Sequence, residues 1–407
     1  MVGVLAGTGA VADEAVLCAM GRVPRERFVP RFWAVDDELG MGGPDHPFEW
    51  QPGEGPWGDR ANELVYDADR ALGIAALGAS PWAGWASSVS APNVVGHMLE
   101  LLRLAPGQRV LEVGTGSGYN AALLSELVGP AGAVTSIELE PDLAAAAAEH
   151  LEAVGCRNVE VVVGDGYAGA PGHGPFDRVV VTAGCPDVSP QWLRQMAPDG
   201  LCLVPLQHGG WHPVTALRPS GRGALGRAES PARFLPLRGS GERQLPWAHP
   251  GPVGHHGPLS ASPLPRAVAV ALLRPTPAGH DWARWDLGFL LALEDSRAVS
   301  VLALAEDRSL AEVAASGREV IASGEQAAAL RDRLVEVAEL WLSLGCPRMQ
   351  DYAMSFAPTS PPGRPTARAG TTRDAPSDMP GAQGSPRGTW TVHRTDYDQA
   401  LWLEEAA

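Results

Sequence analysis

Apolar and polar residues alternate in blocks along residues 109–205, and these blocks predict strands and helices in turn. Short runs rich in valine, isoleucine and leucine predict strands, and apolar positions three and four apart predict helices. The predicted strands are 109–113, 133–138, 159–163, 177–182 and 200–205, and the predicted helices lie near 118–128, 141–154 and 189–197. Short apolar strands that alternate with helices are typical of a parallel, doubly wound α/β sheet.

The segments on either side of this block have different patterns. Helical spacing at residues 10–20 is ended by Gly21 and Pro24, and an apolar run from Val94 to Leu104 predicts a second helix. Between them, residues 40–85 are rich in glycine, proline and tryptophan and predict an irregular, lid-like segment. After the block, residues 214–237 predict a hairpin.

The last third of the chain predicts a smaller α+β domain. A Gly/Pro/His-rich linker, 240–264, separates a first domain at 1–239 from an accessory domain at 265–407. In that domain the patterns predict strands near 267–273 and 299–304, a helix at 325–344, and strand and helix character from Trp390 to Leu403. The tract 358–388 has almost no large apolar residue and predicts disorder.

Composition excludes some classes of function. The chain has 407 residues, 45% of them hydrophobic, and a formal net charge of −16. That charge argues against a general affinity for nucleic acid or for anionic membranes. No run approaches the length of a membrane span, and the first residues lack the basic start of a signal peptide. The five cysteines are scattered without a C-x-x-C pair, so we expect a reduced, cytoplasmic protein.

The turn after the first predicted strand carries the most specific chemistry. Residues 110–124 run from an apolar strand through Gly114, Gly116 and Gly118 into a small-residue helix. Glycine permits such a tight turn, and the helix behind it offers free N–H groups to a ligand. Dinucleotide binders prefer G-x-G-x-x-G. Here the third glycine comes one residue earlier, and with Glu112 the pattern resembles motif I of the S-adenosylmethionine (SAM) methyltransferases.

Acidic residues follow the next two predicted strands. Glu138 ends the second strand, where a carboxylate can accept hydrogen bonds from two ribose hydroxyls. Asp165 ends the third strand, where it can accept from an adenine amino group. Alternatively, each is a strand-end carboxylate in solvent. The occurrence of the glycines, Glu138 and Asp165 at the ends of successive strands favours a cofactor site. The expected cofactor-binding residues are Glu112, Gly114, Thr115, Gly116, Gly118, Glu138, Leu139, Asp165 and Gly166, with Glu112 near the amino-acid end of SAM.

Further motifs resemble the protein-L-isoaspartate (D-aspartate) O-methyltransferases over about residues 10–239. Residues 23–30 read Val-Pro-Arg-Glu-Arg-Phe-Val-Pro, and residues 86–93 read Ala-Ser-Ser-Val-Ser-Ala-Pro-Asn. The first resembles a signature near that family's N-terminus, and the second resembles its T-I-S-x-P signature before motif I. Other matches are Tyr66-Asp67, Ala71-Leu72, Gly164-Asp165-Gly166, Pro175-Phe176-Asp177 and Arg233-Phe234-Leu235-Pro236-Leu237.

The resemblance implies catalytic residues, a cofactor and a substrate class. Ser90 takes the position of the family's active-site serine and Ser88 that of its threonine; SAM is the implied methyl donor. The alternative is that Ser90 or Asn93 caps the helix that follows. The sequence departs from the family at 85–87, which read Trp-Ala-Ser where Gly-Gln is frequent, and at Asn93. The departures lie where the acceptor binds.

These observations lead to three functional hypotheses. The first is a carboxyl O-methyltransferase acting on isoaspartyl or aspartyl side chains of peptides or proteins, with succinimide formation and repair as the outcome. The second uses the same chemistry on one aspartate of a dedicated precursor peptide. The third is a non-catalytic SAM- or peptide-binding module. No metal is expected, because the spacings of His208, His212, His249, His255 and His256 match no metal site.

Overall fold

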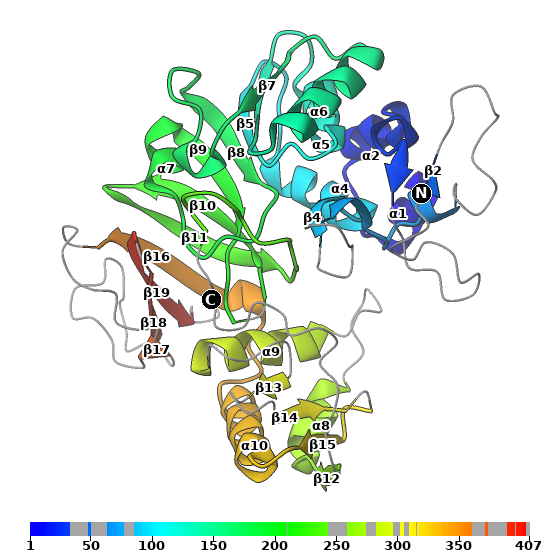
Figure 1. Cartoon of the computed structure of the whole chain (residues 1–407). Helices are drawn as coiled ribbons and strands as arrows, with labels where there is room; N and C mark the ends of the chain where they lie inside the picture. The colour runs from blue at the N-terminus through cyan, green and yellow to red at the C-terminus, as the bar shows by residue number, and fades with distance from the viewer. Residues whose placement is uncertain are drawn as a thin grey trace. The chain divides into compact units, whose positions relative to one another are not determined.

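The computed structural model divides the chain into two compact units (Figure 1). It describes residues 1–32, 48–49, 63–76, 85–209, 211–242, 259–273, 282–295, 302–304, 309–314, 316–359, 371–372, 389–394 and 396–403. The first unit comprises Met1–Gly184, Ser189–Val204 and Phe234–Gly241, and the second comprises Cys185–Val188, Pro205–Arg233 and Glu242–Ala407. The units therefore interleave along the chain, whereas the boundaries 1–239, 240–264 and 265–407 are contiguous and stay predictions.

The first unit contains a parallel five-stranded sheet. Its strands are β5 (Arg109–Val113), β6 (Ala133–Glu138), β7 (Val159–Val163), β8 (Phe176–Val181) and β9 (Met196–Pro205). They lie in the order β7-β6-β5-β8-β9, and every pair is parallel. The chain order reverses between β5 and β8, so the crossovers on either side of β5 run to opposite faces. This confirms the predicted doubly wound, Rossmann-like α/β fold.

The helices between these strands begin and end close to the predicted positions. They are α5 (Tyr119–Val128), α6 (Pro141–Ala153) and α7 (Pro190–Gln195). In α5, residues Ala121 to Leu124 are 0% exposed, so the helix is enclosed on nearly every side. Ser189 caps α7 by accepting a hydrogen bond from the backbone N of Gln191. Because α5 starts one residue after Gly118, its N-terminus lies at the carboxyl end of β5.

The N-terminal segment supplies further elements of the first unit. These are α1 (Val2–Thr8), α2 (Glu14–Arg22), the 3-10 helix η1 (Arg25–Phe28), β1 (Arg31–Phe32), β2 (Phe48–Glu49), β3 (Leu72–Ala76), β4 (Trp85–Val89) and α4 (Pro92–Leu102). The carboxylate of Asp13 caps α2. Strands β3 and β4 pair antiparallel. Most of the predicted irregular segment, 40–85, lies outside the described residues.

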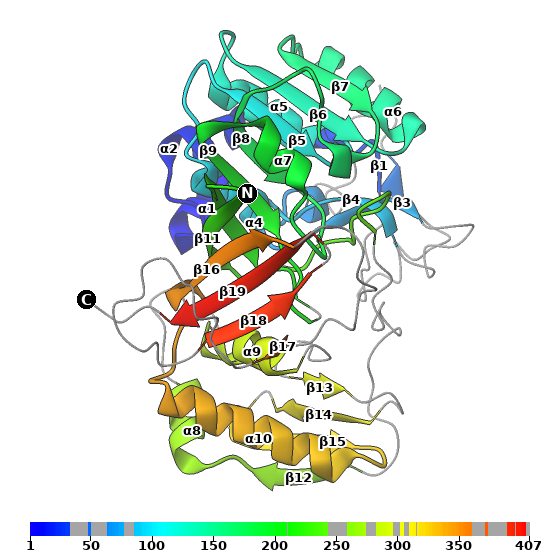
Figure 2. The same cartoon turned by 90° about the vertical axis from the view of Figure 1, so that its left-hand side faces the viewer.

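The second unit contains an antiparallel sheet whose strands come from two distant parts of the sequence. In spatial order they are β10 (Val214–Ser220), β11 (Gly223–Ser230), β16 (Tyr352–Pro358), β19 (Tyr397–Leu403), β18 (Thr389–His393) and β17 (Thr371–Thr372). Figure 2 shows β16, β19 and β18 side by side. The predicted hairpin at 214–237 corresponds to β10 and β11. Helix character near the end of the chain was wrongly predicted, because alternate residues of β19 are buried, as in a strand.

A smaller group of elements completes the second unit. A four-stranded sheet has the order β12 (Ser260–Pro263), β15 (Glu319–Ser323), β14 (Leu310–Val313) and β13 (Leu302–Leu304); the helices are α8 (Arg266–Leu272), α9 (Trp282–Glu294) and α10 (Ala327–Ser343). The strand predicted near 267–273 is wrong, since α8 occupies it. Val268, Ala271 and Leu272 are buried at helical spacing, while Val270 is 57% exposed. Of the tract 358–388, only 358–359 and 371–372 are described.

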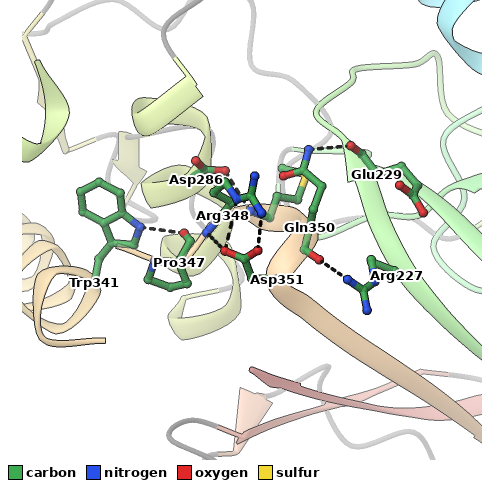
Figure 3. Close-up of polar contacts among 9 residues, drawn as sticks. Arg227, Glu229, Asp286, Trp341, Pro347, Arg348, Gln350 and Asp351 are labelled. Carbon is green, nitrogen blue, oxygen red and sulfur yellow. Dashed lines mark hydrogen bonds and ion pairs between the residues drawn. The ribbon is translucent and has the colours of Figure 1, made fainter. Parts of the chain in front are cut away.

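Within the second unit, the 3-10 helix η4 (Met349–Asp351) makes hydrogen bonds to residues of both β11 and α9 (Figure 3). Arg227 Nη1 donates to the backbone O of Gln350 at 3.0 Å, and Gln350 Nε2 donates to the backbone O of Glu229 at 2.7 Å. On the other side, the backbone N of Met349 donates to Asp286 Oδ1 at 2.9 Å. Burial raises the pKa of Asp286 to about 6. These contacts fix η4 from both sides.

Within the described part of the chain, no helix combines the length and the apolar character that crossing a bilayer requires.

Candidate functional site

Three glycines shape the turn between β5 and α5. The φ angles of Gly114, Gly116 and Gly118 are +97°, +54° and +89°, a region that side-chain-bearing residues rarely adopt. Space is also restricted, because a Cβ atom on Gly114 would lie 2.5 Å from Thr182 Oγ1. The turn therefore requires glycine both for its backbone angles and for the close approach of β8.

Glu138 holds this turn directly. Its Oε2 atom accepts a hydrogen bond from the backbone N of Gly116 at 2.8 Å, and Oε1 accepts from the backbone N of Glu140 at 3.2 Å. The residue is 6% exposed. Leu139 follows it in the short loop before α6. The predicted acidic residue at the end of the second strand therefore lies against the glycine turn, and each carboxylate oxygen has a further lone pair for a ligand hydroxyl.

Glu112 lies beneath the turn and is 0% exposed. Asn120 Nδ2 donates to its Oε1 at 2.8 Å, and the hydroxyl of Ser136 donates to its Oε2. The Ser136 hydroxyl is also 2.6 Å from Thr115 Oγ1, which belongs to the turn. Burial raises the pKa of Glu112 to about 7, although the Ser136 and Asn120 hydrogen bonds oppose that shift. Its direct contacts are thus with Ser136 and Asn120, and contact with the amino-acid end of SAM stays a prediction.

Asp165 and Gly166 lie at the end of β7. Asp165 Oδ1 accepts from the backbone N of Tyr167 at 2.9 Å, and Oδ2 accepts from the backbone N of Ser240 at 2.7 Å. Burial alone would raise the pKa of Asp165, but these hydrogen bonds outweigh it and lower the pKa. A Cβ on Gly166 would lie 2.5 Å from Val113 Cγ1. Glycine thus lets the Asp165 loop pack against the carboxyl end of β5.

The predicted acceptor segment lies against the glycine turn. A Cβ built on Gly116 would be 3.3 Å from Ser87 Oγ and 3.7 Å from the backbone O of Ser88. Ser88 is in β4, paired with Gly73 of β3, and is half-buried. The two groups of residues that the sequence singled out, one for the cofactor and one for the acceptor, therefore meet at the same end of the sheet.

The structure excludes the helix-cap alternative for Ser90 and Asn93. Helix α4 begins at Pro92, its N-cap residue is Ala91, and no side chain makes a capping hydrogen bond. Proline at the first helical position has its φ already fixed and lacks the N–H that a cap would satisfy. Asn93 Nδ2 instead donates to Asp69 Oδ1 at 2.7 Å. The Ser90 side chain is therefore not needed to start the helix.

Two arginines near the site were not predicted as site residues. Arg238 Nη1 forms an ion pair with Glu140 Oε1 at 2.5 Å, and its Nη2 is 3.5 Å from the backbone O of Ala86. Arg25 Nη2 donates to the backbone O of Ser90 at 3.0 Å, and its guanidinium lies 5.0 Å from the ring centroid of Tyr119. Arg25 lies inside the 23–30 signature, and Arg238 directly follows the 233–237 match. These positions within or beside a family motif are the sequence signal that could have identified both arginines.

The sequence offered five histidines as metal ligands, and their spacings matched no metal site. His208 and His212 are described and belong to the second unit, whereas His249, His255 and His256 lie outside the described residues. Among the described residues, no group of three or more His, Cys, Asp or Glu side chains is arranged to hold a metal ion.

Comparison with known proteins matches the first part of the chain to one family. The family model for protein-L-isoaspartate(D-aspartate) O-methyltransferase matches residues 69–242. A protein-L-isoaspartate O-methyltransferase of Aeropyrum pernix is 37% identical over 250 residues, which cover 61% of this chain and 81% of the relative. One from Ignicoccus hospitalis is 35% identical over 234 residues, covering 57% and 93%. The chain belongs to the protein-L-isoaspartate (D-aspartate) O-methyltransferase family.

Proposed function

We propose that the chain is a SAM-dependent carboxyl O-methyltransferase that methylates isoaspartyl side chains of peptides or proteins. The observation that carries this proposal is the approach of Ser87 and Ser88 to Gly116. It leaves little more than the room of one methyl group between a hydroxyl-rich strand and a turn suited to a nucleoside. Family membership supports the same reaction class.

The residues around the turn fit SAM in charge and shape. Glu138 lies 2.8 Å from Gly116 N and keeps lone pairs that two ribose hydroxyls would share. Asp165 is held ionised at the end of β7, in a position suited to an adenine amino group. The N-terminus of α5, directly behind Gly118, suits the carboxylate of the amino-acid end. When bound, SAM supplies an electrophilic methyl group on a sulfonium.

The acceptor residues act by holding and desolvating a carboxylate. An aspartyl or isoaspartyl carboxylate is already ionised at neutral pH, so the site needs no general base. Ser90 and Ser88 donate hydrogen bonds that orient the carboxylate oxygen in line with the methyl group. Their hydroxyls bring no competing charge, and the half-buried position of both residues limits access of water. The site would thereby hold the carboxylate oxygen ready for methyl transfer, in which the sulfur of SAM would keep the electron pair of the broken carbon–sulfur bond.

The methyl ester accounts for a repair outcome. A methyl ester can expel methanol, whereas an ionised carboxylate has no comparable leaving group, so the next backbone nitrogen attacks the ester carbonyl and forms a succinimide. Water then opens the ring to aspartate or isoaspartate without further action by the chain. We place this reaction in the cytoplasm, in keeping with five cysteines that form no C-x-x-C pair.

A second candidate is methylation of one aspartate in a dedicated precursor peptide. The match to the Aeropyrum relative covers 61% of this chain, so a large part has no counterpart in that alignment. A separate unit with two sheets is more than the reaction chemistry requires, and such a unit is suited to binding one particular acceptor.

The test uses SAM labelled in the methyl group and two peptides of identical sequence, one with isoaspartate and one with aspartate. The proposal predicts label in the isoaspartyl peptide, released as methanol at alkaline pH, as expected for an ester. Label only in a small peptide encoded next to this chain would favour the second candidate. Measurable SAM binding without transfer to any of these peptides would favour a non-catalytic binding module.

A further inference from the structure

A completely buried arginine lies behind the acceptor segment. Arg25 begins η1 and is 0% exposed, although an arginine in a protein is rarely fully buried without partners. Nε donates to the backbone O of Val65 at 2.9 Å, and Nη2 donates to the backbone O of Ser90 at 3.0 Å. Burial lowers the pKa of its guanidinium.

The same guanidinium touches the helix that follows the glycine turn. Its Cζ lies 5.0 Å from the ring centroid of Tyr119, the first residue of α5. That distance is within the range of a cation–π contact. Tyr119 is 2% exposed, and Phe28 of η1 packs on its ring at a centroid distance of 5.7 Å. One side chain therefore contacts the Ser90 backbone and the residue adjacent to Gly118.

Burying the guanidinium of Arg25 against Tyr119 lowers the stability of the fold. Arg25 Nη1 and the Tyr119 hydroxyl are buried, and among the described residues neither atom has a partner in good hydrogen-bond geometry, although the guanidinium and the phenol interact electrostatically. A buried polar atom without a well-placed partner loses its hydration without full compensation, and an apolar side chain of similar size would avoid that cost. Such a cost is consistent with a role in placing the backbone, because a planar guanidinium holds two carbonyls in a fixed relative orientation.

We propose that Arg25 is a positioning residue that sets the backbone of Ser90 against the cofactor turn. It binds the carbonyl groups of Val65 and Ser90 and rests on Tyr119, so these three positions keep one geometry relative to one another. Arg25 itself has no exposed surface and acts through Ser90. The inference rests on the proposed function for its kinetic consequence, but its structural consequence can be measured independently.

The kinetic test compares Arg25→Lys and Arg25→Met with the wild-type chain, using labelled SAM and the isoaspartyl peptide. We expect Arg25→Lys to lower kcat by roughly 10-fold or more, since a small misplacement of reacting groups has effects of that size, with the Kd for SAM within about twofold. Arg25→Met should lower kcat further. The control is Arg22→Met, because the Arg22 side chain is 72% exposed and pairs with Glu126 on the surface.

The structural test is amide hydrogen exchange of the same proteins without SAM or peptide. Arg25→Lys should speed exchange at residues 86–93 while β5 and α5 keep wild-type protection. The exchange measurement separates failure of the positioning role from failure of the proposed function. A wild-type chain that methylates nothing overturns the proposed function, whereas the exchange result judges the positioning role by itself.

Two results would overturn the inference. One is an Arg25→Lys protein with wild-type kcat and wild-type exchange at 86–93. The other is a uniform loss of protection and of unfolding temperature in Arg25→Lys, with unchanged kcat per folded molecule, which would make the residue a general stabiliser. If Arg25→Met does not fold, Arg25→Lys still decides between these outcomes, because it keeps the charge and hydrogen-bond donors but loses the planar guanidinium.

Discussion

Glu138 accepts a hydrogen bond at 2.8 Å from the backbone N of Gly116, across 22 residues of sequence. This bond joins the end of β6 to the middle of the glycine turn that follows β5. The residue expected to bind the ribose thus also supports the turn expected to surround the amino-acid end. The proposed cofactor site is therefore preorganised by the sheet itself.

Substitution Gly116→Val should abolish SAM binding measured by calorimetry. Valine is strained at a φ of +54°, and its Cβ would approach Ser87 Oγ at 3.3 Å. The matched control is Gly172→Ala, where φ is +87° but a Cβ meets nothing within 4 Å. Unchanged SAM affinity in folded Gly116→Val would show that the cofactor binds elsewhere.

Ser90→Ala should spare SAM binding and lower kcat by roughly 10- to 100-fold, because the acceptor carboxylate loses a donor that orients it. Since Ala91 is the N-cap of α4, the unfolding temperature should stay at the wild-type value. Steady-state kinetics and thermal unfolding on the same preparation check both statements. Wild-type turnover in Ser90→Ala would remove Ser90 from the acceptor site.

The buried carboxyl of Glu112 should make stability depend on pH. Its pKa is about 7 in the folded chain against 4.5 as a free group, so the unfolded chain ionises first as pH rises. Stability therefore falls between about pH 4.5 and 7, by about 3 kcal/mol from this group. Glu112→Gln should flatten that slope in denaturant titrations. An identical slope in both proteins would mean that Glu112 ionises normally in the folded state.

Arg394→Lys should destabilise the second unit by about 2–4 kcal/mol, as expected for the loss of several charge-assisted hydrogen bonds. Arg394 donates to the backbone O of Gln207 at 2.9 Å, to the backbone O of Pro186 and to Gln399 Oε1. It also faces Nε2 of His208, whose pKa burial holds well below its ordinary value. Arg331→Lys on the surface of α10 serves as the control in denaturant unfolding. Equal stability of the two variants would contradict this.

The sequence predicted the first unit closely because its strands are determined locally. In β5, β6 and β7, short runs rich in valine are bounded by turns, and the predicted ranges match the observed ones. The second unit was predicted less well. Residues 267–273 form an unbroken apolar run, which fits a buried strand as well as a helix, but packing of Val268, Ala271 and Leu272 selects a helix.

Contacts between distant segments could not be predicted from the spacing of residues along the sequence. Arg25 meets Val65 and Ser90, which are 40 and 65 residues away, and only the fold brings them together. The cap alternative for Ser90 failed for a local reason, because Pro92 starts α4 without a side-chain cap. The glycine turn was predictable because its three positive φ angles each require the residue type that the sequence shows.

The most direct test of the central claim is kcat/KM for methyl transfer from SAM to an isoaspartyl peptide and to its aspartyl twin, measured in one assay with Gly116→Val as the inactive control. We expect the wild-type chain to transfer methyl to the isoaspartyl peptide, with a kcat/KM well above that for the aspartyl peptide, and we expect no transfer by Gly116→Val. Transfer to neither peptide by a folded, SAM-binding wild-type chain would contradict it.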